Sequence, residues 1–342
     1  MSRARLAEGT SVVNNLINEA RHIPVGDAQA ILSVTPITLS VPGRGLDLEL
    51  RLTAPVSGRN LPVVLFSHGH GPSLYLPSKD GYGPIVNFLA SHGFAVIQPT
   101  HVNSKVAGLP SDAPGAPLFW RSRVTDMTLI LDRLDEVQAA VPSIAGRLDR
   151  SRIAAVGHSL GAQTVGMLLG ARLTDPQDAS ATDVSLVDPR IIAGVLLAAP
   201  GNGGADLSAG AARNYSALNP DYSYMATPTM VVAGDRDHSP HLTVRDADWH
   251  ADAYHHGAGS KALLTLFGGK HGLGGIAGYD AKETDDEDPD RLAVVKRMTW
   301  AYLRSALYAG EAAWPDACWA LTDRASSLGR VDRKADGVSH GD

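Results

Sequence analysis

The chain has almost no cysteine and no long apolar run. Cys318 is the only cysteine among 342 residues, so no intramolecular disulfide can form and the fold does not depend on an oxidising compartment. Residues 1–27 lack the apolar core of a secretory signal, and no stretch approaches the roughly 20 apolar residues of a membrane span. We therefore expect a cytoplasmic protein without a membrane span.

The chain also lacks a charge excess that would select a charged partner. Its formal net charge is −6, and 19% of the residues are charged. This balance gives no reason to expect nucleic acid or an anionic membrane as a partner. Hydrophobic residues make up 44% of the chain, which is enough for a large core.

The apolar pattern predicts an α/β fold. Residues 31–41 and 46–55 alternate apolar and polar side chains around "PGRG", which is typical of an antiparallel hairpin. Short apolar runs typical of strands buried on both faces follow at 62–69, 94–99, 152–157, 191–200, 229–235 and 262–269. Helix-like stretches lie between or after them at 82–91, 121–140, 160–172, 243–256 and 290–308. The alternation predicts a mostly parallel central sheet with an N-terminal antiparallel hairpin and helices on both faces.

We expect one domain over residues 1–325, followed by a polar, disordered tail at 326–342. Long connections around 103–120, 201–225 and 272–290 are predicted to line the functional site or to form a lid over it. The acidic run 281–290 is expected to be a solvated segment.

The sequence "GHSLG" places Ser159 between two glycines directly after an apolar run and before a helix-like stretch. A serine held in a tight turn between a strand and a helix needs neighbours without side chains, because Cβ atoms there would collide with the adjoining elements. The helix N-terminus favours developing negative charge. Ser159 is therefore the predicted nucleophile, provided that the chain also supplies a base.

A base and an orienting acid follow in the later predicted strand ends. His271 stands in "GGKHGLGG" beyond the last apolar run, where glycines allow the loop to bring the imidazole back over the sheet edge. Asp235 and Asp237 end the preceding run, and either carboxylate could orient the histidine. We favour Asp237, because it lies three residues after Gly234, and expect Asp235 to brace the loop.

The oxyanion donors are predicted to be the backbone amides of His70 and Leu160. The first belongs to "HGHG" at the end of 62–69, where small residues leave N–H groups accessible, and the second follows the nucleophile. The alternative for His68 and His70 is a zinc site. The histidines of 238–241 and 250–256 could likewise be assigned to metal, but without an accompanying Glu or Cys set we expect surface or loop residues. No metal and no cofactor are predicted.

The order of these parts resembles the α/β-hydrolase superfamily over residues 50–310. "HGHG", "GHSLG", "GDRD" and "KHG" follow one another as oxyanion strand, serine, acid and histidine. Residues 62–101 together with "GHSLG" are similar to the branch of platelet-activating-factor acetylhydrolases and chlorophyllases, which cleave carboxylic esters without cofactors. Leu160 stands where chlorophyllases usually carry Arg, so chlorophyll is not the expected substrate.

The resemblance implies a serine hydrolase that cleaves a carboxylic ester through an acyl-enzyme, with Ser159, His271 and Asp237 as the catalytic triad. An apolar ester or lactone is the expected substrate. The same residues would serve a lactone, thioester or amide hydrolase, and a catalytically silent binding protein of this fold is the remaining alternative. The sequence leaves the identity of the substrate and the oligomeric state open.

Overall fold

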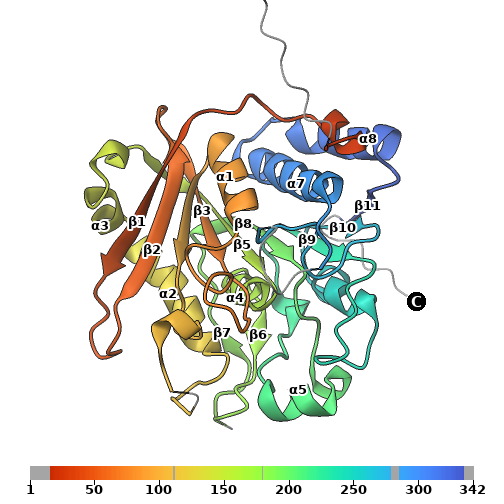
Figure 1. Ribbon diagram of the computed structural model, residues 1–342. Helices are drawn as coiled ribbons and strands as arrows, with labels where there is room; N and C mark the ends of the chain where they lie inside the picture. Colours follow the sequence, from red (N-terminus) through yellow and green to blue (C-terminus); the bar gives the residue numbers. More distant parts are fainter. Residues whose placement is uncertain (1–15, 111, 179, 279–284, 335–342) are drawn as a thin grey trace, which may run out of the picture.

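A computed structural model describes residues 16–110, 112–178, 180–278 and 285–334. It is an α/β structure built on a nine-stranded sheet in the order β1-β2-β4-β3-β5-β8-β9-β10-β11 (Figure 1). The strands are β1 Ile31–Leu39, β2 Leu48–Pro55, β3 Leu61–Ser67, β4 Ala95–Pro99, β5 Leu148–His158, β8 Ile191–Leu197, β9 Thr229–Gly234, β10 Lys261–Leu266 and β11 Gly329–Lys334. A separate pair is formed by β6 Arg172–Leu173 and β7 Val184–Ser185.

The sheet is mostly parallel, as the alternating pattern predicted. Each pair of neighbours from β4 to β10 is parallel. The N-terminal hairpin is antiparallel, as expected, and β2 also meets β4 in antiparallel fashion. The carboxyl ends of the parallel strands therefore meet at one edge of the sheet.

Helices cover both faces of the sheet, because alternate residues of each buried strand enter different apolar clusters. Leu65 of β3 packs with residues of α2 and α4, whereas the next residue, Phe66, packs with residues of α1, α7 and α8. The α-helices are α1 Gly83–Ser91, α2 Trp120–Asp132, α3 Leu134–Ala139, α4 Leu160–Leu168, α5 Ala209–Asn214, α6 Asp252–His256, α7 Pro289–Leu307 and α8 Ala313–Arg324. The 3₁₀-helices are η1 Glu19–His22, η2 Lys105–Ala107, η3 Pro142–Ile144, η4 Gly204–Asp206, η5 Tyr222–Tyr224 and η6 Ala247–Ala251. In this described part of the chain, no helix has both the length and the apolar character needed to cross a membrane.

Two predicted helices differ from the structure. The stretch 121–140 breaks at Arg133 into α2 and α3, and within 243–256 the helical part is 247–256, as the short η6 and α6. Residues 243–246 are held by other contacts, because Thr243 Oγ1 donates to Asp206 O and Asp246 caps the start of η6.

The prediction of a disordered tail is wrong for residues 329–334. These residues form β11, which pairs antiparallel with β10 from Leu266 opposite Gly329 to Lys261 opposite Lys334. Their sequence, "GRVDRK", is polar because the strand lies at the sheet edge and is buried on few positions. Residues 335–342 lie outside the described residues.

The other edge of the sheet is formed by β1, whose register with β2 shifts between Val34 and Ile37 around Pro36.

Candidate active site

The predicted site residues lie at the carboxyl edge of neighbouring strands. The "HGHG" turn follows β3, Ser159 follows β5, Asp237 follows β9 and His271 follows β10. The connection after β3 runs to β4 on one side, whereas the connection after β5 runs to β8 on the other side, so the connections diverge between β3 and β5. Ligands of open α/β sheets bind at such a switch point, outside the carboxyl ends.

Ser159 occupies a strained turn between β5 and α4. Its backbone has φ 55° and ψ −122°, a conformation that non-glycine residues rarely adopt and that commonly marks functional sites. A Cβ atom at position 157 would lie 2.1 Å from Gly161 O, and one at position 161 would lie 2.0 Å from Ser67 O. Both neighbours must therefore be glycine, because the turn packs against itself and against the end of β3.

The structure brings Asp237 and His271 into contact. His271 Nδ1 donates to Asp237 Oδ2 over 2.8 Å. The carboxylate side chain is 1% exposed and the imidazole is 38% exposed. Asp235 instead accepts a 2.7 Å hydrogen bond from Gly268 N, which braces the turn before the histidine. The preferred choice of Asp237 over Asp235 thus agrees with the observed contacts.

This pair shifts the pKa of both groups. Burial raises the pKa of the Asp237 carboxyl, but His271 and His250 outweigh it and hold the pKa well below its usual range. Burial lowers the pKa of His271, but Asp237 overcomes this and raises the pKa above its usual 6.5. The carboxylate therefore stays ionised and the imidazole binds a proton more readily than a free histidine.

The loop that carries His271 is held from both sides by an acidic residue. Asp286 is 5% exposed, and its Oδ2 accepts hydrogen bonds from Lys270 N over 2.8 Å and from Gly274 N over 3.3 Å. The expectation of a solvated acidic run is therefore wrong for Asp286, because its carboxylate satisfies two loop amides. Residues 281–284 of that run lie outside the described residues.

His158 connects the serine turn to the histidine loop. Its Nε2 donates to His271 O over 2.8 Å, and its Nδ1 accepts from the Tyr82 hydroxyl over 2.9 Å. That hydroxyl in turn accepts a 2.9 Å hydrogen bond from Gly69 N. Burial, together with the charge of His271, lowers the pKa of His158 to about 3. A neutral imidazole therefore joins the loop after β3, the serine turn and the loop after β10.

The direct link between serine and histidine is not formed in this structure. Among the described residues no hydrogen bond joins Ser159 Oγ to His271. The two segments are nevertheless close, because the ring of His158, the residue before the serine, has its centroid 4.9 Å from that of His271. Catalytic hydrogen bonds in unliganded sites are often long and tighten only when substrate binds. His158 and Tyr82 were not among the predicted site residues, and the adjacency of His158 to the serine was the signal that the sequence offered.

Both predicted oxyanion amides are free to receive a ligand. In the described part of the chain, neither His70 N nor Leu160 N donates to a protein acceptor. The loop passes close to the serine, because a Cβ atom at position 69 would lie 3.4 Å from Ser159 Cβ. Since Gly69 N already donates to Tyr82, the amide of His70 is the available one of these two adjacent amides.

The zinc alternative for His68 and His70 does not fit the contacts. His68 is 1% exposed, its Nδ1 donates to Gly69 O over 2.7 Å and its Nε2 accepts from His101 N over 3.0 Å. Both ring nitrogens are therefore occupied. Burial lowers the pKa of His68 well below its usual value, and its role is to hold the loop.

His250 was expected to be a surface or loop residue, but it lies buried beside Asp237. Its side chain is 1% exposed. Its Nδ1 donates to Ala199 O over 2.7 Å. Its Nε2 lies 3.2 Å from Asp237 Oδ2, without the alignment of a hydrogen bond. One ligand atom from each of Asp237, His250 and His271 lies within 4.8 Å of the others, so these residues could hold a metal ion. A metal there would displace the proton between Asp237 and His271, so metal binding and a base role for His271 exclude each other.

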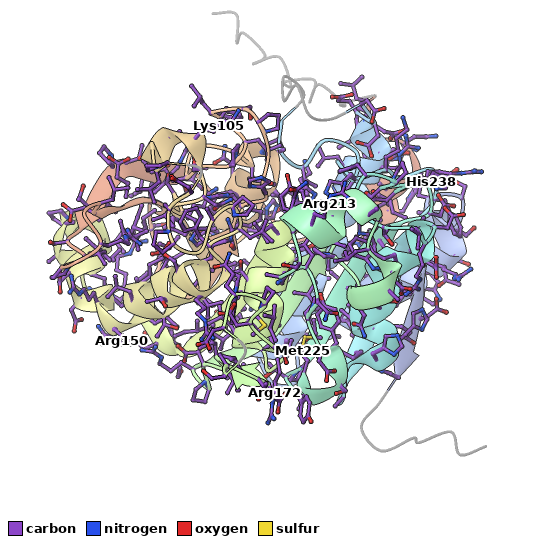
Figure 2. All side chains as sticks on the ribbon, turned by 90° about the horizontal axis from the view of Figure 1, so that it is seen from below. Lys105, Arg150, Arg172, Arg213, Met225 and His238 are labelled. Atoms are coloured by element: carbon purple, nitrogen blue, oxygen red, sulfur yellow. The ribbon has the colours of Figure 1, made fainter. Side chains whose placement is uncertain are left out.

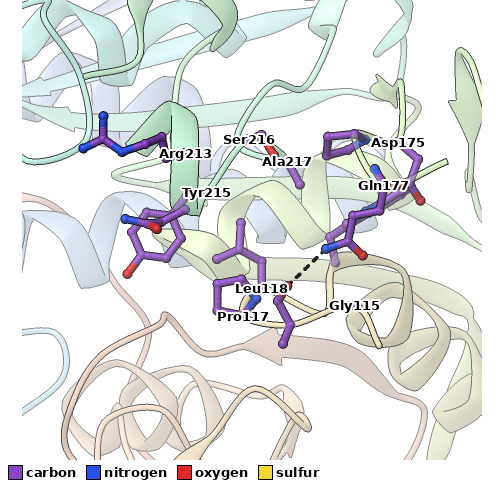
Figure 3. A pocket seen from close by; sticks show the side chains of 13 residues that line it. Gly115, Pro117, Leu118, Asp175, Gln177, Arg213, Tyr215, Ser216 and Ala217 are labelled. Carbon is purple, nitrogen blue, oxygen red and sulfur yellow. Dashed lines mark hydrogen bonds between the residues drawn. The ribbon is translucent and has the colours of Figure 1, made fainter. Parts of the chain in front are cut away.

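A cavity of about 450 Å³ adjoins this edge (Figure 3). Two of the predicted site-lining loops contribute to it, and its lining consists of residues 115–118, Trp120, 175–177 and 213–217. The ring of Tyr215 packs edge-on against His70, with centroids 6.1 Å apart. Ala217 O accepts a 2.6 Å hydrogen bond from Gln163 in α4. Residues that line the cavity therefore contact the oxyanion loop and the helix that follows Ser159.

The cavity lining is mixed rather than uniformly apolar. Leu118 and Trp120 are apolar, whereas Gln177 and Arg213 present polar groups. Arg213 belongs to α5, which covers this end of the molecule and appears near the middle of the view from below (Figure 2). A ligand with both apolar and polar parts would fit such a lining.

Comparison with known proteins adds no family to these observations. No family model matches the sequence, and neither does any of the curated proteins. The arrangement itself combines a strained, partly exposed serine, a buried carboxylate paired with an imidazole, and two free amides near the serine. Together these groups suit nucleophilic attack on a carbonyl.

Proposed function

We propose that this protein is a serine hydrolase of the α/β-hydrolase fold that cleaves a carboxylic ester. The observation that carries the proposal is Ser159 in a strained turn after β5, with the Asp237–His271 pair at the ends of β9 and β10 on the same sheet edge. This is the chain order and placement of nucleophile, acid and base that acyl transfer on such a sheet requires.

In this mechanism Ser159 Oγ attacks the ester carbonyl while His271 Nε2 takes its proton. Asp237 accepts the Nδ1–H, which fixes the tautomer and stabilises the imidazolium. The amides of His70 and Leu160 donate to the oxyanion. His271 then gives its proton to the departing alcohol, leaving an acyl-enzyme. Water, deprotonated by the same imidazole, releases the acid and restores the serine.

The cavity beside His70 would receive one substituent of the ester. Its volume of about 450 Å³ lies within the ordinary range for small-molecule sites. Its mixed lining supports a substrate that is not uniformly apolar. Lactones, thioesters and amides would use the same catalytic residues, and a panel of acyl substrates with matched chain lengths separates these classes.

Labelling with a fluorophosphonate probe tests the proposal directly. We expect covalent modification of Ser159, located by peptide mapping, because such probes need a serine whose proton is taken by a base. The Ser159→Ala variant is the matched control and should not react. Incubation with EDTA should leave hydrolysis unchanged. Wild-type protein that is not labelled at Ser159, or activity that requires a metal, would contradict the proposal.

The raised pKa of His271 predicts the pH dependence. The base must be neutral, and a pKa above 6.5 keeps it protonated to higher pH. Hydrolysis should therefore be present above this pKa and lost as the pH falls through it, with a midpoint above the usual 6.5 of a histidine. Asp237 stays ionised throughout, because its pKa is held well below the usual range. A profile of kcat/KM that is flat from about pH 5 to 8 would rule out this role of His271.

A further inference from the structure

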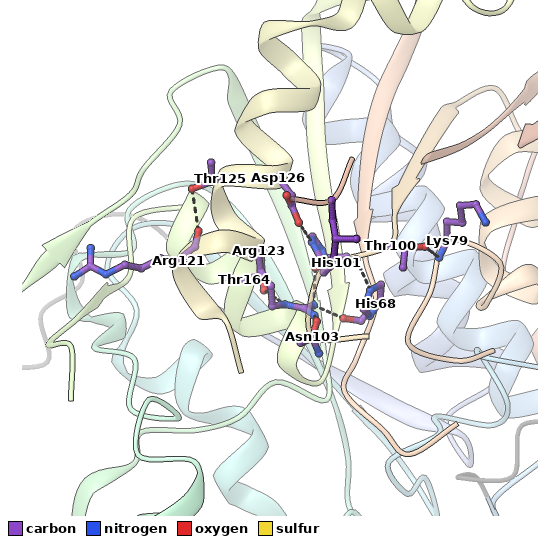
Figure 4. Close-up of polar contacts among 12 residues, drawn as sticks. His68, Lys79, Thr100, His101, Asn103, Arg121, Arg123, Thr125, Asp126 and Thr164 are labelled. Carbon is purple, nitrogen blue, oxygen red and sulfur yellow. Dashed lines mark hydrogen bonds and ion pairs between the residues drawn. The ribbon is translucent and has the colours of Figure 1, made fainter. Parts of the chain in front are cut away.

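A fully buried arginine lies between the two segments that carry the oxyanion amides. Arg123 of α2 is 0% exposed, and all three nitrogens of its guanidinium donate hydrogen bonds (Figure 4). Its four acceptors come from three other parts of the chain and are Thr164 Oγ1 at 2.9 Å, Ser67 Oγ at 3.0 Å, His68 O and Asn103 Oδ1.

One arm of this hydrogen-bond network reaches the residue that follows the serine, Leu160, at its carbonyl oxygen. Thr164 Oγ1 accepts from Arg123 Nε and donates to Leu160 O over 3.1 Å. Thr164 and Leu160 lie one turn apart in α4. The guanidinium is therefore connected through a single side chain to the first turn of α4, where the Leu160 amide points out of the helix end.

The other arm reaches the loop after β3. Arg123 Nη2 donates to His68 O, two residues before His70. Arg123 Nη1 donates to Asn103 Oδ1, and Asn103 Nδ2 donates to His70 Nδ1 over 3.1 Å. The guanidinium therefore contacts the loop directly and also holds the side chain of His70 through one intermediate.

Arg123 is linked to the buried carboxylate of Asp126 through two intervening side chains. Ser67 Oγ, which accepts from Arg123, donates to His101 Nε2 over 3.0 Å, and His101 Nδ1 donates to Asp126 over 2.8 Å. Asp126 also pairs with Arg44. Burial lowers the pKa of Arg123 to about 9, although Asp126 opposes this, and burial raises the pKa of Asp126 to about 7. An apolar side chain would fill this space between α2 and the sheet at lower cost, so filling space does not account for an arginine here.

We infer that Arg123 is a positioning residue that sets the separation and direction of the His70 and Leu160 amides. The inference rests on the proposed function, since it concerns the transition state of that reaction. Arg123 touches no reacting atom in this scheme. Its fork of donors ties the loop after β3 to the turn after Ser159, and a shift of about 1 Å between catalytic groups can cost about 100-fold in rate.

Two single substitutions cut the arms separately without removing the buried charge. Thr164→Val removes the acceptor next to Leu160 and keeps the side-chain shape, and Asn103→Ala removes the link to His70. For each we expect kcat to fall about 10- to 100-fold, with KM changed less than about 3-fold, because an oxyanion contact acts mainly in the transition state. Thr125→Val is the matched control. Thr125 Oγ1 donates to Arg121 O, the carbonyl four residues earlier in α2, just as Thr164 Oγ1 donates to Leu160 O in α4, but Thr125 lies on an exposed part of its helix.

The inhibition constant Ki of phenylboronic acid distinguishes positioning of the oxyanion amides from a role in stability alone, because loss of stability alone would not change Ki. Its boron binds Ser159 Oγ and places a hydroxyl at the oxyanion position, so its Ki should rise by the same factor by which kcat/KM falls in each variant. Wild-type values of kcat and Ki in both variants overturn the inference. An equal rise of KM and Ki does so too. If the wild type neither hydrolyses esters nor reacts with the fluorophosphonate, the proposed function fails, and the inference fails with it.

Discussion

Ser159→Ala should lower kcat for ester hydrolysis by about 10⁴-fold or more, the largest effect that we expect from a single substitution. Without the hydroxyl no acyl-enzyme forms, and the oxyanion amides and substrate binding alone sustain a small residual rate. The unusual backbone conformation of residue 159 is retained, because alanine carries the same Cβ. Steady-state kinetics and thermal unfolding of the same samples separate lost chemistry from lost fold.

Two further variants test whether the effect is specific to this serine. Ser151→Ala changes an exposed serine of β5, whose hydroxyl donates to Asp149 Oδ1 two residues earlier, and should retain wild-type activity. Ser159→Gly should be as inactive as Ser159→Ala, yet more stable to unfolding by about 1 kcal/mol, because glycine adopts positive φ without strain. Activity above about 1% of wild type in either variant at position 159 would exclude Ser159 as the nucleophile.

Asp237→Asn is expected to lower kcat by about 10³- to 10⁴-fold while binding of substrate changes little. The carboxylate accepts the Nδ1–H of His271 over 2.8 Å, and an amide at this place can hold the imidazole in the wrong tautomer. The loss of the negative charge also removes the cause that raises the pKa of His271. The residual activity should therefore lose its acid limb at a lower pH than in the wild type.

The neighbouring carboxylate is the control for this substitution. Asp235 Oδ1 accepts from Gly268 N, and an asparagine oxygen can accept the same hydrogen bond. Asp235→Asn should thus reduce kcat less than about 10-fold and leave the pH profile unshifted. Equal losses of kcat in the two variants would show that both carboxylates serve only to hold the loops.

The sheet, the serine turn and the order of its partners could be predicted because each depends on short stretches of sequence. An apolar run that ends in glycine fixes a strand end, and in a parallel sheet strand ends share one edge. Ser159, Asp237 and His271 follow three such runs. The glycines at 157 and 161 are required by close approaches within the turn and to Ser67 O at the end of β3, and the short pattern "GHSLG" is enough to predict this turn.

The residues around this centre could not be predicted because they arrive from elements with no local signature. His250 comes from a short helical segment that resembled a surface helix, and its burial depends on Ala199 and Asp237, which belong to other strand ends. Arg123 has the sequence context of an exposed helical arginine. Its burial follows only from how α2 packs against α4 and the end of β3.

The two edges of the sheet have a consequence for how the protein associates with itself. An exposed edge strand offers unpaired N–H and C=O groups to a second chain, and proline, bulges and charged side chains suppress such pairing. Pro36 and the register shift interrupt β1, while β11 is short and carries Arg330, Arg333 and Lys334 around its one acid. Pairing of an edge strand with the edge strand of a second molecule is thus disfavoured at both edges of the sheet. Any self-association in solution should proceed through helices or loops, and aggregation by strand addition should require prior release of β11 from the apolar strand β10.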